Sequence, residues 1–321
     1  MAASSARPRL VILMLLLVGI ILCSCEDSVS PPPGVEEPFS AYGILNPRLT
    51  RQTMLVSPTA SQLFDFADSI DAIVTSRDVA GGQRRVWRDS VVVGDRGQRD
   101  HIFYSDFRPD FGSEHTIVIR RSDGATSSVD VRIPNQVELD LEDNGTHLLQ
   151  LNVIGKEIGV LRAIVTYGVR YYELGGGPCS PLFKFYEISV EDAVEERPGG
   201  AVIGIDMDLH EQLLRSYLAM DFDIVFPDTH TGLALTHMKI EVTIGNDSWA
   251  PPGGVFDLNV LSSPRTLANV SNGYGFVGSG YNQDRALWPS KEAVQDTWFF
   301  DFLMRPPGVC LDYCGCGLYA E

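Results

Sequence analysis

The sequence predicts an all-β protein made of two successive β-rich domains. Short apolar segments alternate with polar residues at a period of two, which places one face of each strand in a core and the other in water. Turn residues separate these segments at short intervals. Helical periodicity is confined to one stretch that begins near residue 208.

The first domain, residues 39–134, is expected to be an immunoglobulin-like β-sandwich. Seven short strands in about 96 residues are typical of that architecture. The expected strands are 39–45, 52–56, 71–77, 84–93, 101–105, 115–121 and 127–133. Asp123-Gly124 predicts a hairpin between the last two strands. Trp87 is expected to lie in the core or to pack across strands.

The second β-rich domain, residues 137–304, is expected to contain one short helix. Asp208 is the expected N-cap, and Glu211 follows three residues later as in a capping box. The apolar face should hold Leu209, Leu213 and Tyr217, with Leu214 and Leu218 beside it and His210 off it. Strands are expected at 160–172, 182–190, 201–207, 222–226, 237–244 and 255–260.

Two motifs in this second domain resemble ligand-binding loops but lack a required feature. The segment from Asp140 to Gly145 has the alternating oxygens of a calcium loop, but Leu151 stands where the loop requires a glutamate. An Asn-Gly hairpin turn is therefore predicted. The segment from Gly273 to Gly278 matches G-x-G-x-x-G, but no helix-forming segment follows it. We expect a glycine-aromatic strand or turn in which backbones approach closely.

The N-terminus predicts export. Arg7 and Arg9 precede an apolar run from Leu10 to Leu22, which is shorter than the roughly 20 residues of a membrane-spanning helix. Residues 1–24 are therefore expected to be a signal peptide. Leu22-Cys23-Ser24-Cys25 resembles the lipobox of bacterial lipoproteins, which implies cleavage before Cys25 and lipid on its sulfur. A simple signal peptide cut near Ser24 and lipidation of Cys23 are the alternatives.

Residues 25–38 are expected to tether the folded part to the membrane. Pro31-Pro32-Pro33 lack backbone donors and favour an extended polyproline form, which makes a semi-rigid spacer. The formal net charge of −17 argues against nucleic acid as a partner and against a surface that lies on anionic lipid. The lipid is thus the expected membrane attachment, and no cofactor is expected.

The cysteines of the mature chain predict disulfide chemistry. An exported compartment permits disulfides, and the sequence does not choose among the three pairings of four cysteines. We expect at least one bridge that involves the irregular tail, 305–321, while a zinc or iron–sulfur site is the alternative. The disulfide candidates are Cys179, Cys310, Cys314 and Cys316.

Matches to catalytic motifs are incomplete. His210-Glu211 begins like a zinc-protease helix, but Leu214 replaces the second histidine, and Ser279 lacks the spacing of a nucleophile elbow. No catalytic residue or metal ligand is assigned, and the protein is expected not to be an enzyme. The alternative is a secreted glycan-directed hydrolase with paired carboxylates. A deep cleft with convergent carboxylates would favour it, whereas a flat sandwich with exposed aromatics would favour binding.

The order of features along the chain carries a resemblance. A lipobox, the acidic pair Glu26-Asp27, a proline-rich spacer and the strand from Tyr42 to Pro47 precede short β segments, Asn272 to Gly278 and a cysteine-bearing tail. This order resembles uncharacterised outer-membrane lipoproteins of Bacteroidota-type bacteria, found alongside TonB-dependent receptors. The resemblance implies an immunoglobulin-like N-terminal part and no established activity. The acidic pair implies outward display.

We therefore expect a lipid-anchored binding, accessory or structural module at the outer membrane, periplasmic or surface-exposed, with a TonB-dependent transporter as a partner. Aromatic residues on β modules supply contact area for ligands. Core packing is the alternative role for the same side chains. The candidate ligand contacts are Tyr274, Phe276, Tyr281 and Trp288.

Overall fold

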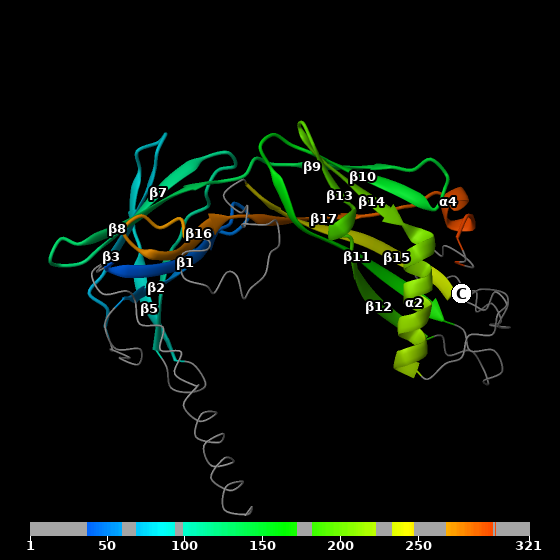
Figure 1. Cartoon of the computed structure of the whole chain (residues 1–321), viewed down its shortest axis with the longest axis horizontal. Coiled ribbons are helices and arrows are strands. Elements are labelled where there is room, and N and C mark those ends of the chain that lie inside the picture. The colour runs from blue at the N-terminus through cyan, green and yellow to red at the C-terminus, as the bar shows by residue number, and fades with distance from the viewer. Residues whose placement is uncertain are drawn as a thin grey trace, which may run out of the picture. The chain divides into compact units, whose positions relative to one another are not determined.

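Two facing sheets form the first β-sandwich (Figure 1). The computed structural model describes residues 37–59, 69–93, 99–171, 182–222, 233–246, 268–297 and 299. All of them belong to the unit 37–321, which is separate from the unit 1–36. One sheet has the order β16-β1-β2-β6-β5, with β1 (Phe39–Leu45), β2 (Gln52–Pro58), β5 (Arg88–Val93), β6 (Arg99–Ser105) and β16 (Tyr274–Ser279). The other has the order β4-β3-β7-β8, with β3 (Ile73–Asp78), β4 (Arg84–Val86), β7 (Glu114–Arg120) and β8 (Thr126–Arg132).

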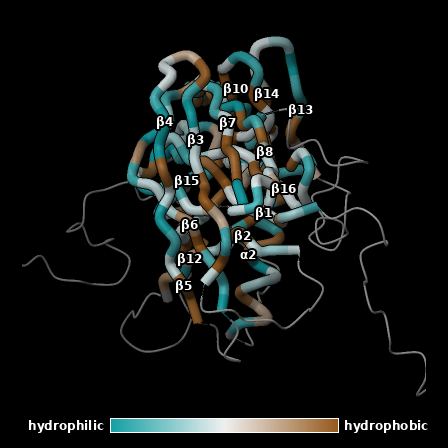
Figure 2. The backbone as a smooth tube through the Cα atoms, turned by 90° about the vertical axis from the view of Figure 1, so that its left-hand side faces the viewer, coloured by the Kyte–Doolittle hydropathy of each residue, from teal (hydrophilic) through white to brown (hydrophobic). Residues whose placement is uncertain are grey.

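The strand order confirms the immunoglobulin-like architecture. Strands β1-β2-β6-β5 correspond to A-B-E-D of an immunoglobulin domain, and β4-β3-β7-β8 correspond to C′-C-F-G. Alternation places Phe39, Ala41 and Leu45 of β1 in a core shared by both sheets, and Figure 2 shows the polar–apolar alternation along the chain. The predicted Asp123-Gly124 hairpin joins β7 to β8, with Gly124 at φ +92°.

One predicted strand is wrong, because 84–93 contains two strands in different sheets. β4 pairs with β3 and β5 pairs with β6. Trp87 lies between them and is buried, as expected. Its backbone N–H donates to Val74 O and its indole N–H donates to Ser76 Oγ, both at 2.9 Å. These two bonds hold the chain at the point where it crosses from one sheet to the other.

Strand β16 corrects the predicted domain boundaries. It comes from the range 137–304 but pairs in parallel with β1, so it completes the first sandwich. The predicted close backbone approach in the glycine motif is confirmed. Gly275 has φ +97°, and a Cβ there would overlap the carbonyl oxygen of Ala41. The pairing of β1 with β16 could not be predicted from local sequence patterns, because the two segments are far apart in the sequence.

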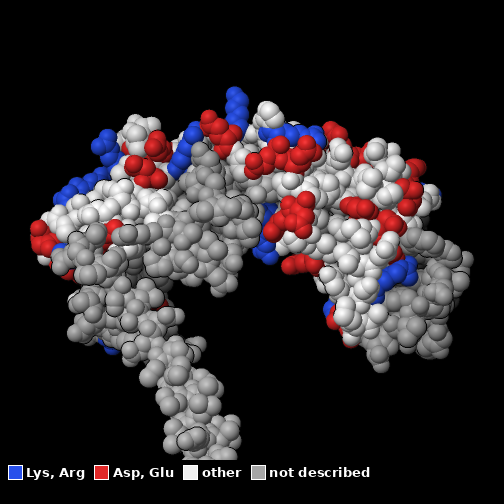
Figure 3. Space-filling model, in the orientation of Figure 1, with Lys and Arg blue, Asp and Glu red and all other residues white. Residues whose placement is uncertain are grey.

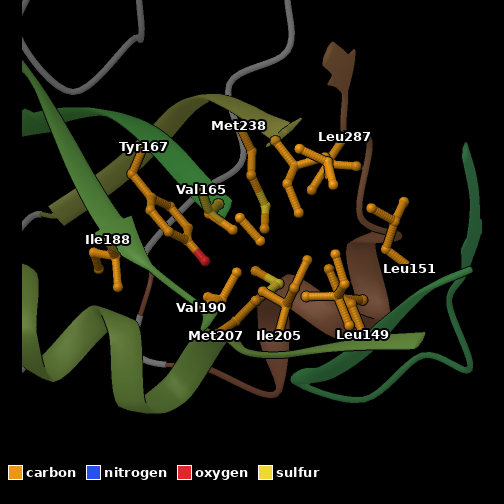
Figure 4. Close-up of a cluster of buried hydrophobic side chains, with 14 of the residues drawn as sticks. Leu149, Leu151, Val165, Tyr167, Ile188, Val190, Ile205, Met207, Met238 and Leu287 are labelled. Carbon is orange, nitrogen blue, oxygen red and sulfur yellow. The ribbon is translucent and has the colours of Figure 1, made fainter. Parts of the chain in front are cut away.

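A second sandwich follows. One sheet has the order β13-β14-β10-β9, with β9 (Glu138–Glu142), β10 (Leu148–Ile154), β13 (Val194–Arg197) and β14 (Gly200–Asp206). The other has the order β12-β11-β15-β17, with β11 (Gly159–Tyr171), β12 (Leu182–Ser189), β15 (Leu233–Gly245) and β17 (Tyr281–Ala286). Side chains of both sheets meet in one core (Figure 4). Asn144-Gly145 lies in the connection of the antiparallel strands β9 and β10, as predicted, but this connection is a loop longer than a two-residue turn, because the last paired residues are Glu142 and Gln150.

The main helix, α2 (Met207–Phe222), differs from its prediction in cap and face. Leu209 N–H donates to Asp206 Oδ1 at 3.0 Å, so Asp206 caps the helix instead of Asp208. Leu209 is exposed and His210 is buried, the reverse of the prediction. The buried face is the one that meets Tyr167 of β11, and hydrophobicity alone did not identify it.

Of the remaining secondary-structure predictions, some are corrected by the structure and others concern residues that the structure does not describe. Phe222 ends α2 and does not start a strand, and α4 (Lys291–Gln295) is a second helix among the described residues. A 3-10 turn, η1 (Glu191–Ala193), precedes β13. The predicted strand 255–260, the signal peptide, the tether and the tail 305–321 lie outside the described residues.

Candidate functional site

An outward-facing apolar surface covers the five-stranded sheet of the first sandwich. Tyr42 and Ile44 of β1 are 46% and 51% exposed, because Phe39, Ala41 and Leu45 occupy the inward positions of the same strand. Residues that are paired across neighbouring strands have their side chains on the same face of the sheet. The pairing of β1 with β2 and β16, and of β2 with β6, therefore extends this surface across four strands. We call this surface the aromatic face; its members are Tyr42, Ile44, Leu55, Ile102, Tyr104, Tyr274 and Phe276.

Two of the four predicted contact residues belong to the aromatic face. Phe276 pairs with Tyr42, and Tyr274 pairs with Ser40. Val277, the residue after Phe276 on the same strand, is buried in the core, so Phe276 lies on the outer side. Both rings are partly exposed. The structure therefore gathers Tyr274 and Phe276 with aromatic and aliphatic residues that lie more than 200 positions earlier in the sequence.

Arginine borders one end of the aromatic face. The Arg51 guanidinium lies 4.8 Å from the centre of the Tyr104 ring and pairs with Asp106 at 2.7 Å. Its hydrogen bond to Asp106 holds the pKa of that carboxyl below its usual value. Arg88 of β5 lies directly across the ladder from Tyr104. An apolar centre with an arginine border is typical of a protein–protein interface.

Charge is distributed unevenly along the chain. Residues 37–134 hold twelve arginines, no lysine and thirteen carboxylates, for a net charge of −1. Residues 135–321 hold eleven cations and 26 carboxylates, for a net charge of −15. On the face drawn in Figure 3, acidic side chains are concentrated over the second sandwich. The members of the aromatic face on β1, β2 and β6 therefore belong to the nearly neutral part of an acidic chain, and Tyr274 and Phe276 join them from the acidic part.

The other two predicted contact residues lie elsewhere. Tyr281 on β17 is buried and is not a surface contact, which corrects the prediction. Its hydroxyl accepts from Val137 N–H at 3.0 Å and donates to Asn135 O at 2.9 Å, and its ring meets Phe111 edge to face. Core packing, the alternative, is its role. Trp288 is 62% exposed but follows β17 in the second sandwich, apart from the aromatic face.

A buried polar cluster occupies the segment that begins like a zinc-protease helix. Tyr167 Oη and His210 Nδ1 are 2.7 Å apart, and Phe299 stacks on the Tyr167 ring. Burial lowers the pKa of His210 to about 4, so Tyr167 shares this hydrogen bond with a neutral imidazole at pH 7. Glu211 is the only buried carboxyl among the described residues; burial raises its pKa, and it pairs with Arg215. Leu214, in the place of a second histidine, lies in the core.

The carboxylate of the calcium-like loop has a local structural role. Asp143 accepts from Gly145 N–H at 2.8 Å, and it also accepts from the backbone N–H and the hydroxyl of Ser290. Ser290 caps α4 by accepting from Ala293 N–H at 3.1 Å. Asp143 therefore fixes the turn and joins it to α4. Among the described residues, no group of three or more His, Cys, Asp or Glu is arranged to hold a metal ion.

Several predictions fall on parts of the chain that the structure does not describe. The lipidation site Cys25 and the disulfide candidates Cys179, Cys310, Cys314 and Cys316 all lie there. In the described segments, no helix combines the length and apolar character required to cross a bilayer.

Five members of the aromatic face were missed from the sequence: Tyr42, Ile44, Leu55, Ile102 and Tyr104. A usable signal was present, since β1 carries large apolar residues at both inward and outward positions of an alternating strand. In a sandwich strand with one wet face, the outward positions are usually polar. Apolar residues on both sides of a strand therefore indicate either a second buried face or a docking surface.

Comparison with known proteins yields no family. No protein-family model matches the sequence, and no curated protein is significantly similar to it. Two structures of a pullulanase from Anoxybacillus sp. LM18-11, one complexed with maltotriose, are 11% and 12% identical over 65% and 70% of this chain, with TM-scores of 0.21 and 0.22. This chain covers 24% and 28% of their length. Bovine butyrophilin is 10% identical over 64% of this chain and 92% of its own, with a TM-score of 0.17. At these TM-scores the likeness carries no argument.

Proposed function

We propose that this protein is a lipid-anchored accessory module of the bacterial outer membrane, and that its aromatic face docks a protein embedded in that membrane. The observation that carries the proposal is the exposed apolar surface on the sheet β16-β1-β2-β6-β5. Contiguous exposed apolar residues on a folded domain mark interaction sites. A flat sheet surface suits another protein surface, whereas a small molecule is usually held in a concave pocket.

The chemistry of the surface supports a protein partner. The face mixes aromatic with aliphatic side chains, and Arg51 and Arg88 border it. Arginine and aromatic residues are enriched in protein interfaces, while lysine is depleted. The whole range 37–134 follows this pattern, because it holds twelve arginines and no lysine. A partner with an apolar centre and a carboxylate at its border would match this surface.

The chain length between the predicted anchor and the aromatic face supports a partner in the membrane. Phe39 opens β1 only fourteen residues after Cys25. An extended chain of this length spans at most ~50 Å. The first sandwich is thus confined to the layer next to the bilayer if Cys25 carries the lipid. A transporter such as a TonB-dependent receptor is the kind of partner that exposes protein surface in this layer.

Site-specific photo-crosslinking tests the proposal in the native membrane. A photo-reactive phenylalanine at position 42 should yield an adduct with an integral outer-membrane protein, identified by mass spectrometry. Replacing Tyr42 and Ile44 by Ser should reduce co-purification of that protein at least tenfold. The matched control replaces Leu148 and Ile154, which are each 50% exposed on β10 of the second sandwich, by Ser. The control variant should retain the partner.

Two outcomes would contradict the proposal. Equal recovery of the partner with both double variants would show that the aromatic face is not the docking surface. Adducts formed only with soluble proteins would remove the membrane partner. A Cys25→Ser variant grown with labelled fatty acid separates anchoring from docking, because the label should disappear while the purified proteins still bind in detergent.

A further inference from the structure

A second exposed aromatic group lies on the other sandwich. Phe183 and Phe185 of β12 are 50% and 54% exposed on the outer face of the sheet β12-β11-β15-β17. Their ring centres are 4.8 Å apart at an interplanar angle of 86°, so one ring presents its face beside the edge of the other. Lys184 and Tyr186, the alternate residues of the strand, point to the opposite side, where both contact Asp221 of α2.

The backbone beneath Phe185 is shaped to receive its ring. Gly168 of β11 lies across from Phe185 and from His237 of β15. A Cβ at position 168 would lie 3.0 Å from Phe185 Cε1 and 2.9 Å from His237 Cβ. The ladder is irregular at this point, and Thr236 Oγ1 donates to Gly168 O at 2.9 Å. The glycine and the bulge together bring the His237 ring to 6.1 Å from the Phe185 ring.

An arginine without a hydrogen-bond partner for its Nε completes the group. Arg170 of β11 is the cross-strand partner of Phe183. Its Nε is shielded from solvent and has no hydrogen-bond partner in the described part of the chain. Because the Nε is shielded, a ligand would meet this guanidinium at its terminal nitrogens. The guanidinium fork matches a carboxylate in geometry as well as in charge.

The geometry points to a binding site for a carboxylate-bearing sugar unit of an acidic glycan, formed by Phe183, Phe185, Arg170 and His237. The apolar C–H face of a pyranose ring would pack on the exposed phenylalanine rings, and its carboxylate would accept from Arg170. The next row of the sheet supplies polar groups for the sugar hydroxyls, since Thr166 pairs with Glu187 on one side and Lys239 on the other.

This site is independent of the aromatic face. The two groups lie on different sandwiches, and no residue is common to both. A variant of one can therefore fail while the other still binds. The half of the chain that surrounds Arg170 carries a net charge of −15. Net repulsion would keep acidic glycans away from most of this surface and leave the Arg170 group as the local exception.

Calorimetric titration of the purified mature protein with tetragalacturonic acid tests the assignment. The methyl-esterified tetramer keeps the rings and removes the charges, so it should bind at least tenfold more weakly. Phe185→Ala should weaken acid binding at least tenfold. Arg170→Gln should do the same for the acid and leave the weak binding of the ester unchanged. Binding of the acid should fall with added NaCl, because salt screens the arginine–carboxylate pair.

The matched control is Phe276→Ala, which removes the same ring from the aromatic face. It should leave glycan affinity unchanged, and circular dichroism confirms that each variant is folded. The assignment is overturned if the wild type binds neither tetramer at millimolar concentration. It is also overturned if Arg170→Gln weakens acid and ester equally, or if Phe185→Ala and Phe276→Ala behave alike.

Discussion

The buried pair Tyr167–His210 makes the stability of the second sandwich depend on pH. His210 lies on the first turns of α2 and is enclosed by the core, with Tyr167 Oη 2.7 Å from its Nδ1. Burial lowers its pKa to about 4, below the ordinary value of 6.5. The folded state therefore keeps the imidazole neutral at a pH where the unfolded chain protonates it. We expect acid to release α2 from the sheet that contains β11.

The sign and size follow from proton linkage. Because the folded pKa is depressed, the stabilisation is fully present above pH 6.5 and is lost as the pH falls from 6.5 towards 4. A gap of about 2.5 pKa units corresponds to roughly 3 kcal/mol, at ~1.4 kcal/mol per unit. This is a large fraction of the 5–15 kcal/mol that stabilises a typical domain. Glu211 next to His210 acts in the opposite direction, since its raised pKa favours folding at low pH.

Hydrogen–deuterium exchange between pH 7 and pH 4.5 measures the effect locally once intrinsic exchange rates are corrected for pH. Peptides of α2 should lose protection as the pH falls, while peptides of β1 and β2 in the first sandwich, which contain no histidine or carboxylate, serve as the internal control. The variant His210→Gln keeps a polar side chain of similar size that does not titrate. It should be less protected than the wild type at pH 7 and should show a flatter pH dependence.

Equal pH dependence of α2 protection in the wild type and in His210→Gln would refute this reasoning. So would a loss of protection that is uniform over both sandwiches, because it would show that the acid response is global and does not arise at His210.

Two further predictions concern positions whose role is decided by tertiary contacts. Gly275→Ala should destabilise the first sandwich by ~2 kcal/mol or more, because its Cβ would meet Ala41 O in the parallel ladder. Gly124→Ala, at a similar φ with no atom within 4 Å of the added Cβ, should cost only ~1 kcal/mol. Urea unfolding followed by circular dichroism compares the two variants, and equal losses would contradict the steric argument. Tyr281→Phe should lower the free energy of unfolding by ~1–3 kcal/mol, because it leaves Val137 N–H and Asn135 O without their partner. Tyr104→Phe on the exposed aromatic face should change the free energy of unfolding little. Similar effects of the two variants would argue against a contribution from the buried hydrogen bonds.

Much of the β architecture could be predicted from local sequence patterns. Strand β1 was predicted with its observed bounds, because it is rich in apolar residues and Asn46-Pro47 follow it as turn residues. The predicted Asp-Gly turn formed, and Asn-Gly lies in the β9–β10 connection; in both places the glycine adopts a positive φ that other residues avoid. The burial of Trp87 was also expected from its type and surroundings.

Only some residues of the candidate sites could be predicted from the sequence. Tyr274 and Phe276 were selected as exposed aromatics, and the structure places both on the aromatic face. Tyr281 was selected for the same reason but is buried, because a tyrosine buries its ring wherever its hydroxyl finds partners. Phe183 and Phe185 were assigned to a strand without a role, since their exposure depends on which sheet edge the strand occupies.

The sequence by itself therefore determined the class of the fold, the alternation of its strands and the chemistry of its turns. These depend on the short-range geometry of the chain, which residue types and their spacing encode directly. The tertiary structure alone decided that β16 returns to pair with β1, that His210 faces the core, and that the aromatic face and the Arg170 group exist as surfaces. Each of these joins residues that are distant in sequence, and such pairings are selected by the free energy of the whole packed core.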